Sequence, residues 1–129
     1  LYRNDGGSFI DVAAELDMEG GPREHGDGGV DCTVGDYNND GHFDLFVATY
    51  GLNKLYQNNG GGGFEEVSTA MGIDGNDHMV GASWGDFNND GRLDLFAADG
   101  LWLQPHRSGC IPSRSSDAYA SDARTVLVV

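Results

Sequence analysis

The distribution of apolar and polar residues divides the chain into short strands joined by polar turns. A β-prone run, Val30–Gly35, leads into an acidic bend, and the run after the bend, Phe43–Thr49, is apolar on both faces, as in a strand buried between layers. Two further runs, "KLYQN" and "FEEV", are separated by the glycine run Gly60–Gly63, which is typical of a hairpin turn. Together these four runs predict one antiparallel sheet of four strands.

The same elements recur along the chain. The segment Gly35–Ala48 aligns without a gap with Gly85–Ala98, and 10 of 14 positions are identical. A second pair, Leu1–Val12 and Leu55–Val67, matches with one added residue. The repeating unit is about 50 residues long, a length typical of a propeller blade.

The repeat predicts an all-β fold: a fragment of a β-propeller in which one full four-stranded antiparallel blade is flanked by two half blades. We expect single helical turns at Ala13–Leu16 and Ser68–Met71, each leading toward the next unit. Four segments follow from this interpretation: 1–29, the second half of a preceding blade with a linking loop; 30–78, the complete blade with its link; 79–103, the first half of the next blade; and 104–129, an atypical tail expected to be a linker or disordered.

The acidic bend is a nine-residue loop that occurs twice. Oxygen-bearing side chains stand at loop positions 1, 3, 5 and 9, and glycine stands at position 6. Because oxygens at alternate positions converge when the chain curls, and glycine permits the sharp turn, this pattern suits Ca²⁺, which takes six to eight oxygen ligands. The predicted side-chain ligands are Asp36, Asn38, Asp40 and Asp44 in the first loop, and Asp86, Asn88, Asp90 and Asp94 in the second.

Two other interpretations of the loop are weaker. An EF-hand requires Glu at position 12 and a helix on each side, whereas position 12 here is Val47 or Ala97, inside an apolar strand. A hairpin turn alone would explain the Asn-Asp-Gly sequence. It would not explain the outer aspartates, Asp36 and Asp44, which recur at the same offsets in the second loop.

The net negative charge of the chain argues against some classes of binding partner. The chain has 21 acidic and 7 basic residues and a net charge of −14. Such a surface repels nucleic acid and anionic lipid and attracts cations, so we expect no nucleic-acid partner. No apolar run approaches the roughly 20 residues of a membrane span, so we expect no membrane insertion. The chain starts at Leu1 without a leader pattern, and we expect it to be part of a larger protein.

These motifs resemble the FG-GAP/VCBS repeat family, which includes the β-propeller of integrin α-subunits. The similarity is greatest to repeats of bacterial secreted proteins that often accompany an ASPIC/UnbV domain. In that family the hairpin between the first two strands of a blade binds Ca²⁺ through side chains at positions 1, 3, 5 and 9 and the main-chain carbonyl of position 7. The resemblance therefore adds the main-chain oxygens of His42 and Arg92 and implies about two Ca²⁺ ions.

The resemblance also implies a role. We expect a calcium-binding, non-catalytic binding or adhesion scaffold in an extracellular or periplasmic protein, with an unidentified protein or glycan ligand and the remaining blades of the parent propeller as partners. One alternative is the propeller module of a secreted enzyme of polysaccharide lyase or phospholipase type, with catalytic residues in the loop Met18–Gly29 or elsewhere in the parent. Another alternative is a propeller lectin with sugar sites between blades.

The remaining notable side chains suggest ordinary structural roles. Cys32 lies in an alternating strand and is predicted to be a small buried core residue, with a disulfide to Cys110 as the alternative. The histidines lack zinc-like spacing and are expected at the surface, and the tryptophans are expected in the core rather than as ligand platforms. These residues are His25, His42, His78 and His106, and Trp84 and Trp102.

Overall fold

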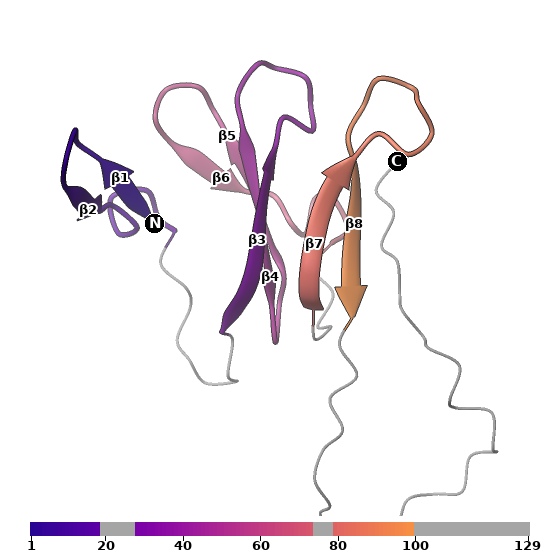
Figure 1. The fold of residues 1–129 in the computed structure, drawn as a ribbon, viewed down its shortest axis with the longest axis horizontal. Helices are drawn as coiled ribbons and strands as arrows, with labels where there is room; N and C mark the ends of the chain where they lie inside the picture. The colour runs from indigo at the N-terminus through magenta and orange to yellow at the C-terminus, as the bar shows by residue number, and fades with distance from the viewer. Residues whose placement is uncertain (19–27, 74–78, 100–129) are drawn as a thin grey trace, which may run out of the picture.

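The computed structural model describes residues 1–18, 28–73 and 79–99, and this part of the chain is all-β (Figure 1). A four-stranded antiparallel sheet, β3-β4-β5-β6, is flanked by two sheets of two strands, β1-β2 and β7-β8. The described residues contain no helix, and therefore no helix long and apolar enough to cross a membrane. The strands are β1 (Tyr2–Asn4), β2 (Phe9–Asp11), β3 (Gly29–Gly35), β4 (Asp44–Thr49), β5 (Lys54–Asn58), β6 (Phe64–Glu66), β7 (Met79–Gly85) and β8 (Asp94–Asp99).

The predicted fold class is confirmed. One complete four-stranded unit lies between two half units, an arrangement consistent with blade fragments of a β-propeller. The glycine run at residues 60–63 joins β5 to β6, as its composition indicates. The expected helical turns are single hydrogen-bonded turns, in which Leu16 N donates to Val12 O and Met71 N donates to Val67 O.

The sequence repeat produces a backbone repeat. In both inner hairpins the register closes at the acidic loop, with Gly35 opposite Asp44 and Gly85 opposite Asp94. Both hairpins also have a register irregularity near their other end, between Gly29 and Asp31 in β3 and at the matching place in β7. The two acidic loops consequently project from the same end of the sheets (Figure 1).

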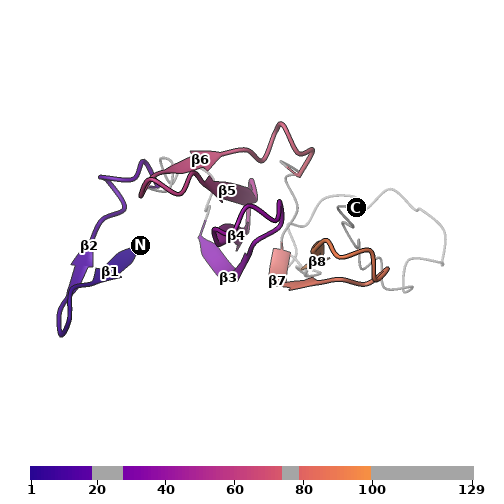
Figure 2. The same ribbon diagram turned by 90° about the horizontal axis from the view of Figure 1, so that it is seen from above.

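The core lies between the complete sheet and β7-β8. Seen from above, β3 lies beside β7, and the full sheet extends away from this contact through β4 and β5 to β6 (Figure 2). Phe46 and Ala48 on β4 pack with Leu95 and Ala97 on β8 in one buried cluster, which Met79 completes at the start of β7. Every residue of β4 is buried or half-buried: Phe46 and Ala48 are buried in this core, while Leu45 and Val47, on the other face, are half-buried, so the structure covers the predicted buried strand fully on one face only.

Equivalent residues differ in burial according to what lies beside them. Leu55 and Tyr56 on β5 are 2% and 8% exposed, whereas their counterparts Leu1 and Tyr2 are 47% and 65% exposed. The Leu-Tyr pair is the same in both places, but β5 lies between β4 and β6 while β1 pairs only with β2. The N-terminal half unit therefore presents a surface that in the complete unit is covered by an inner pair of strands.

One burial prediction is wrong. Cys32 is a free and exposed thiol. Its counterpart Ala82 is half-buried against the core, because the face of β7 turned toward the first unit is covered by that unit. The matching face of β3 has no such cover in the described residues. Several residues that the sequence singled out lie outside the described part of the chain: Cys110, Trp102, His25, His78, His106 and the tail 104–129.

Candidate metal centres

The two acidic loops have the same backbone shape. Asn39 and Asn89, at loop position 4, have φ values of 58° and 60°, and Gly41 and Gly91, at position 6, have φ values of 89° and 87°. Positive φ disfavours most side chains, while glycine adopts it freely and asparagine is several-fold enriched there. The Asn-Asp-Gly sequence thus produces a double bend that turns the loop back toward its first residue.

Within the first loop, the acidic side chains are oriented by main-chain N–H groups. Asp36 accepts hydrogen bonds from Asp40 N at 3.0 Å and from Gly41 N at 2.9 Å, one on each carboxylate oxygen. Asp40 accepts one from His42 N at 2.8 Å on Oδ1 and one from the Asn38 amide at 2.8 Å on Oδ2. The N–H of His42 is the principal reason that the pKa of Asp40 is lowered.

Asp44 closes the loop as the first residue of β4, where it is fully buried. Its carboxylate accepts hydrogen bonds from Tyr37 N at 3.2 Å and from Asn58 N at 2.8 Å. Burial raises the pKa of Asp44, and the negative charges of Asp40 and Asp36 raise it further, although the two N–H donors act in the opposite direction. Asp44 is thus a buried carboxylate close to two other acidic side chains.

The second loop repeats the hydrogen bonds made within the loop, while the bond from Asn58 to Asp44 has no counterpart among the described residues. Asp86 accepts from Asp90 N at 3.1 Å and from Gly91 N at 2.9 Å. Asp90 accepts from Arg92 N at 2.9 Å, and the buried Asp94 accepts from Phe87 N at 2.8 Å. All ten residues predicted as ligands are described, and the structure places them in two matching sets of five.

Donor chemistry in each loop suits a hard cation, and the aspartates retain acceptor capacity. An ionised carboxylate has about four lone-pair sites, so a single N–H on each oxygen leaves others available. Within the described residues, however, no three side chains of His, Cys, Asp or Glu gather closely enough to hold a metal by themselves. A metal centre here would combine the three aspartates with the asparagine and with main-chain oxygen, as the sequence predicts.

Sequence reasoning missed two residues that support the first loop. Asn58, the last residue of β5, donates its N–H to Asp44 and its side-chain amide to Phe43 O at 3.2 Å. Tyr37, at position 2, donates its N–H to Asp44 and its hydroxyl to Gln57 at 3.1 Å. The available signal was the repeated "LYxN" motif, since Asn4 in "LYRN" matches Asn58 in "LYQN".

A comparison with models of protein families identifies the repeat that contains these loops. Residues 36–97 match the model of the FG-GAP-like repeat. This segment is an FG-GAP-like repeat. The FG-GAP match begins at Asp36, position 1 of the first loop, and ends within β8, so it contains both acidic loops and the core between the two units. No curated protein matches the chain.

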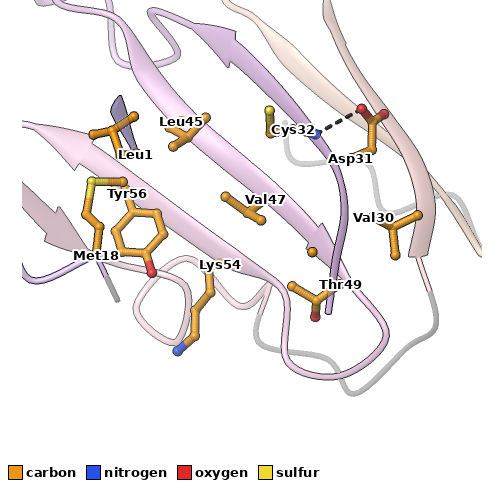
Figure 3. A pocket seen from close by; sticks show the side chains of 11 residues that line it. Leu1, Met18, Val30, Asp31, Cys32, Leu45, Val47, Thr49, Lys54 and Tyr56 are labelled. Atoms are coloured by element: carbon orange, nitrogen blue, oxygen red, sulfur yellow. Dashed lines mark hydrogen bonds between the residues drawn. The ribbon is translucent and has the colours of Figure 1, made fainter. Parts of the chain in front are cut away.

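A pocket lies on the face of the complete unit that is turned away from β7-β8. This pocket, of about 540 Å³, lies between Leu1 and the face formed by β3, β4 and β5 (Figure 3). Leu45 and Val47 form part of its apolar wall. Its two charged side chains already have partners: Asp31 accepts from Cys32 N at 2.9 Å and Ala82 N at 3.0 Å, and Lys54 pairs with Glu66 at 3.0 Å.

Proposed function

We propose that this chain is a calcium-binding FG-GAP repeat segment of an extracellular or periplasmic protein, where it serves as a non-catalytic binding or adhesion scaffold. The observation that carries the proposal is the concentration of acidic charge in two matching loops, where no aspartate forms an ion pair within the described residues. Each holds three aspartates within nine residues. In the described part of the chain, the ion pairs of acidic side chains involve Asp5, Asp11 and Glu66 and no loop aspartate. A divalent cation would offset the mutual repulsion of the three carboxylates.

Calorimetry with Ca²⁺ tests this proposal. We expect about two sites with dissociation constants of roughly 10⁻⁴ to 10⁻³ M, the range of extracellular modules, and weaker binding of Mg²⁺. The double replacement Asp40→Ala with Asp90→Ala should abolish both sites, since it removes the position-5 ligand from each loop. Glu15→Ala with Glu65→Ala is the matched control, because it also removes two exposed acidic charges but both lie outside the loops.

The proposal fails under either of two results. The first is unchanged Ca²⁺ binding after both position-5 aspartates are replaced. The second is Mg²⁺ binding as strong as that of Ca²⁺, because Mg²⁺ demands a smaller octahedral shell that a nine-residue loop of mixed donors does not favour.

The distribution of exposed apolar surface supports further blades as partners. Leu45 and Val47, in the wall of the pocket, correspond to Leu95 and Ala97, which are buried against the preceding unit. The same packing repeated once toward the N-terminus would fill the pocket with apolar side chains from another blade. On the opposite side Phe96, the counterpart of the buried Phe46, is 39% exposed. The outer face of the complete unit and the outer face of β7-β8 thus each expose apolar residues whose counterparts are buried where these two units meet.

A further inference from the structure

The two acidic loops are connected across the gap between the units. They face each other over a cleft of about 530 Å³, whose wall includes Asp36 and Asp86, the position-1 aspartates of the two loops. Asn39 bridges this cleft: its side-chain amide donates a hydrogen bond to Gly91 O at 3.2 Å. This contact joins position 4 of one loop to position 6 of the other.

Both ends of the Asn39 bond adjoin groups that hold the predicted ligands. Asp40, which directly follows Asn39, donates its N–H to Asp36. Gly91, whose carbonyl accepts the Asn39 amide, donates its own N–H to Asp86. The Asn39 bond therefore connects the groups that orient the first aspartate of each loop.

A ring contact beside the bridge joins the same two units. The rings of Tyr37 and Trp84 are stacked, with centroids 6.0 Å apart and an interplanar angle of 10°. Tyr37 N donates to Asp44, and Trp84 Nε1 donates to Thr33 O at 3.4 Å. Tyr37 is thus bound to its own loop through its N–H and contacts the second unit through its ring. Together with the Asn39 bond, this contact connects the first loop to the second unit at positions 2 and 4.

We propose that Asn39 is a positioning residue that couples the two metal centres, so that an ion in one loop strengthens binding in the other. This inference rests on the proposed calcium binding. An ion held by the second loop fixes the Gly91 peptide, which in turn holds Asn39 and the N–H groups that follow it. The first loop then loses less conformational freedom when it binds its own ion, which is the physical basis of the coupling.

The repeat supplies a matched control. Asn39→Gly keeps the net charge and permits the positive φ of this position but removes the amide donor. Asn89→Gly makes the same change at the same position of the second loop, where the side chain has no hydrogen-bond partner among the described residues. Any effect of replacing asparagine by glycine as such should appear in both variants, while an effect of the bridge should appear only in the first.

A double-mutant cycle measures the coupling through the Ca²⁺ affinity of the first loop. Asp90→Ala disables the second loop, and its effect is compared between chains that retain Asn39 and chains that carry Asn39→Gly. We expect Asp90→Ala to weaken the first loop by about two- to tenfold more when Asn39 is present, a factor that corresponds to one net hydrogen bond. The cycle cancels the charge lost with Asp90, which is common to both backgrounds. The control cycle exchanges the two loops. Asp40→Ala disables the first loop, and its effect on the Ca²⁺ affinity of the second loop should be the same in chains that retain Asn89 and chains that carry Asn89→Gly.

Hydrogen exchange of the calcium-free chain gives a second readout. Asn39→Gly should accelerate exchange of the Asp90 and Gly91 amides in the second loop, and Asn89→Gly should leave the Asp40 and Gly41 amides unchanged. If Ca²⁺ binds but the affinities show no dependence on Asn39, or if exchange changes only in the loop that carries the replacement, the coupling is overturned. If the unaltered chain binds no Ca²⁺, the proposed function itself fails, which is a separate result.

Discussion

Gly35 shows at the scale of one residue how closely the complete unit and the β7-β8 half unit approach each other. A methyl group built on Gly35 would lie 2.8 Å from Cδ1 of Trp84 and 3.0 Å from Cδ1 of Leu93. Real carbon contacts are longer, so a side chain here would displace the Trp84 ring and with it the stack on Tyr37. The glycine at the end of β3 is therefore required by packing between units rather than by an unusual backbone angle.

We expect Gly35→Ala to lower the free energy of unfolding by about 1–3 kcal/mol, the usual cost of overpacking. Gly61→Ala is the control: nothing lies within 4 Å of the added methyl group, and Gly61 does not have a positive φ. The midpoint of urea unfolding measures both variants. Equal midpoints for the two would show that the units do not pack as closely as the structure places them.

At the residue scale, the sequence predicts features whose signal is local. The nine-residue repeat predicts two loops of the same shape, and the structure gives both loops the same hydrogen bonds at positions 1, 5 and 6. The bond from Asn39 to Gly91 joins residues 52 apart, and the stack of Tyr37 on Trp84 also joins different units. Such contacts are set by how sheets pack, which no short motif records.

At the scale of elements, β4 and β8 show that one sequence can have two environments. Both strands start with a buried aspartate and continue with Leu-Phe. Phe46 is 1% exposed because it points between the units, whereas Phe96 points away from the core cluster and is 39% exposed. The positions of the strands were predictable from turn signals and apolar runs. The exposure of Cys32 was not, because burial of a strand face depends on whether another sheet covers it.

The contrast between β4 and β8 predicts unequal mutational costs. Phe46→Leu should lower the free energy of unfolding by about 1–2 kcal/mol, because it leaves a cavity inside the core cluster. Phe96→Leu makes the same chemical change at a partly exposed site and should cost at most about 0.5 kcal/mol. Urea unfolding of the two variants beside the unaltered chain measures the difference. A loss at Phe96 as large as that at Phe46 would contradict the placement of the core on one side of β8.

At the scale of the whole molecule, the net charge of −14 makes folding sensitive to ions and to pH. Asp44 is the clearest contributor because it is buried at the start of β4 and its pKa is raised by that burial. A carboxyl whose pKa is raised in the folded chain stabilises folding below its ordinary pKa, and this contribution is lost as the pH rises through the raised value. Without calcium, the Asp44 contribution to stability should therefore fall as the pH rises from about 4.

Calcium should act in the opposite sense, because it binds the ionised carboxylates. At about 1 mM Ca²⁺ and a dissociation constant near 0.1 mM, binding contributes roughly 1.4 kcal/mol per site at neutral pH, which corresponds to a Tm increase of several degrees. The gain should shrink as the pH falls toward 4, where protons compete with the ion for the aspartates. Such stabilisation requires millimolar Ca²⁺, which is why the proposed location is outside the cytosol.

Melting curves between pH 4 and 7, recorded with chelator and with 1 mM Ca²⁺, test this behaviour. The two sets of Tm values should diverge as the pH rises, and Asp44→Asn should flatten the chelator series by removing its titration from this range. Subtracting the Asp44→Asn series also removes the contribution of groups such as Glu66, whose pKa is lowered by its hydrogen bond with Ser68. A constant separation between the two series across this range would mean that the added ion does not bind the ionised loops.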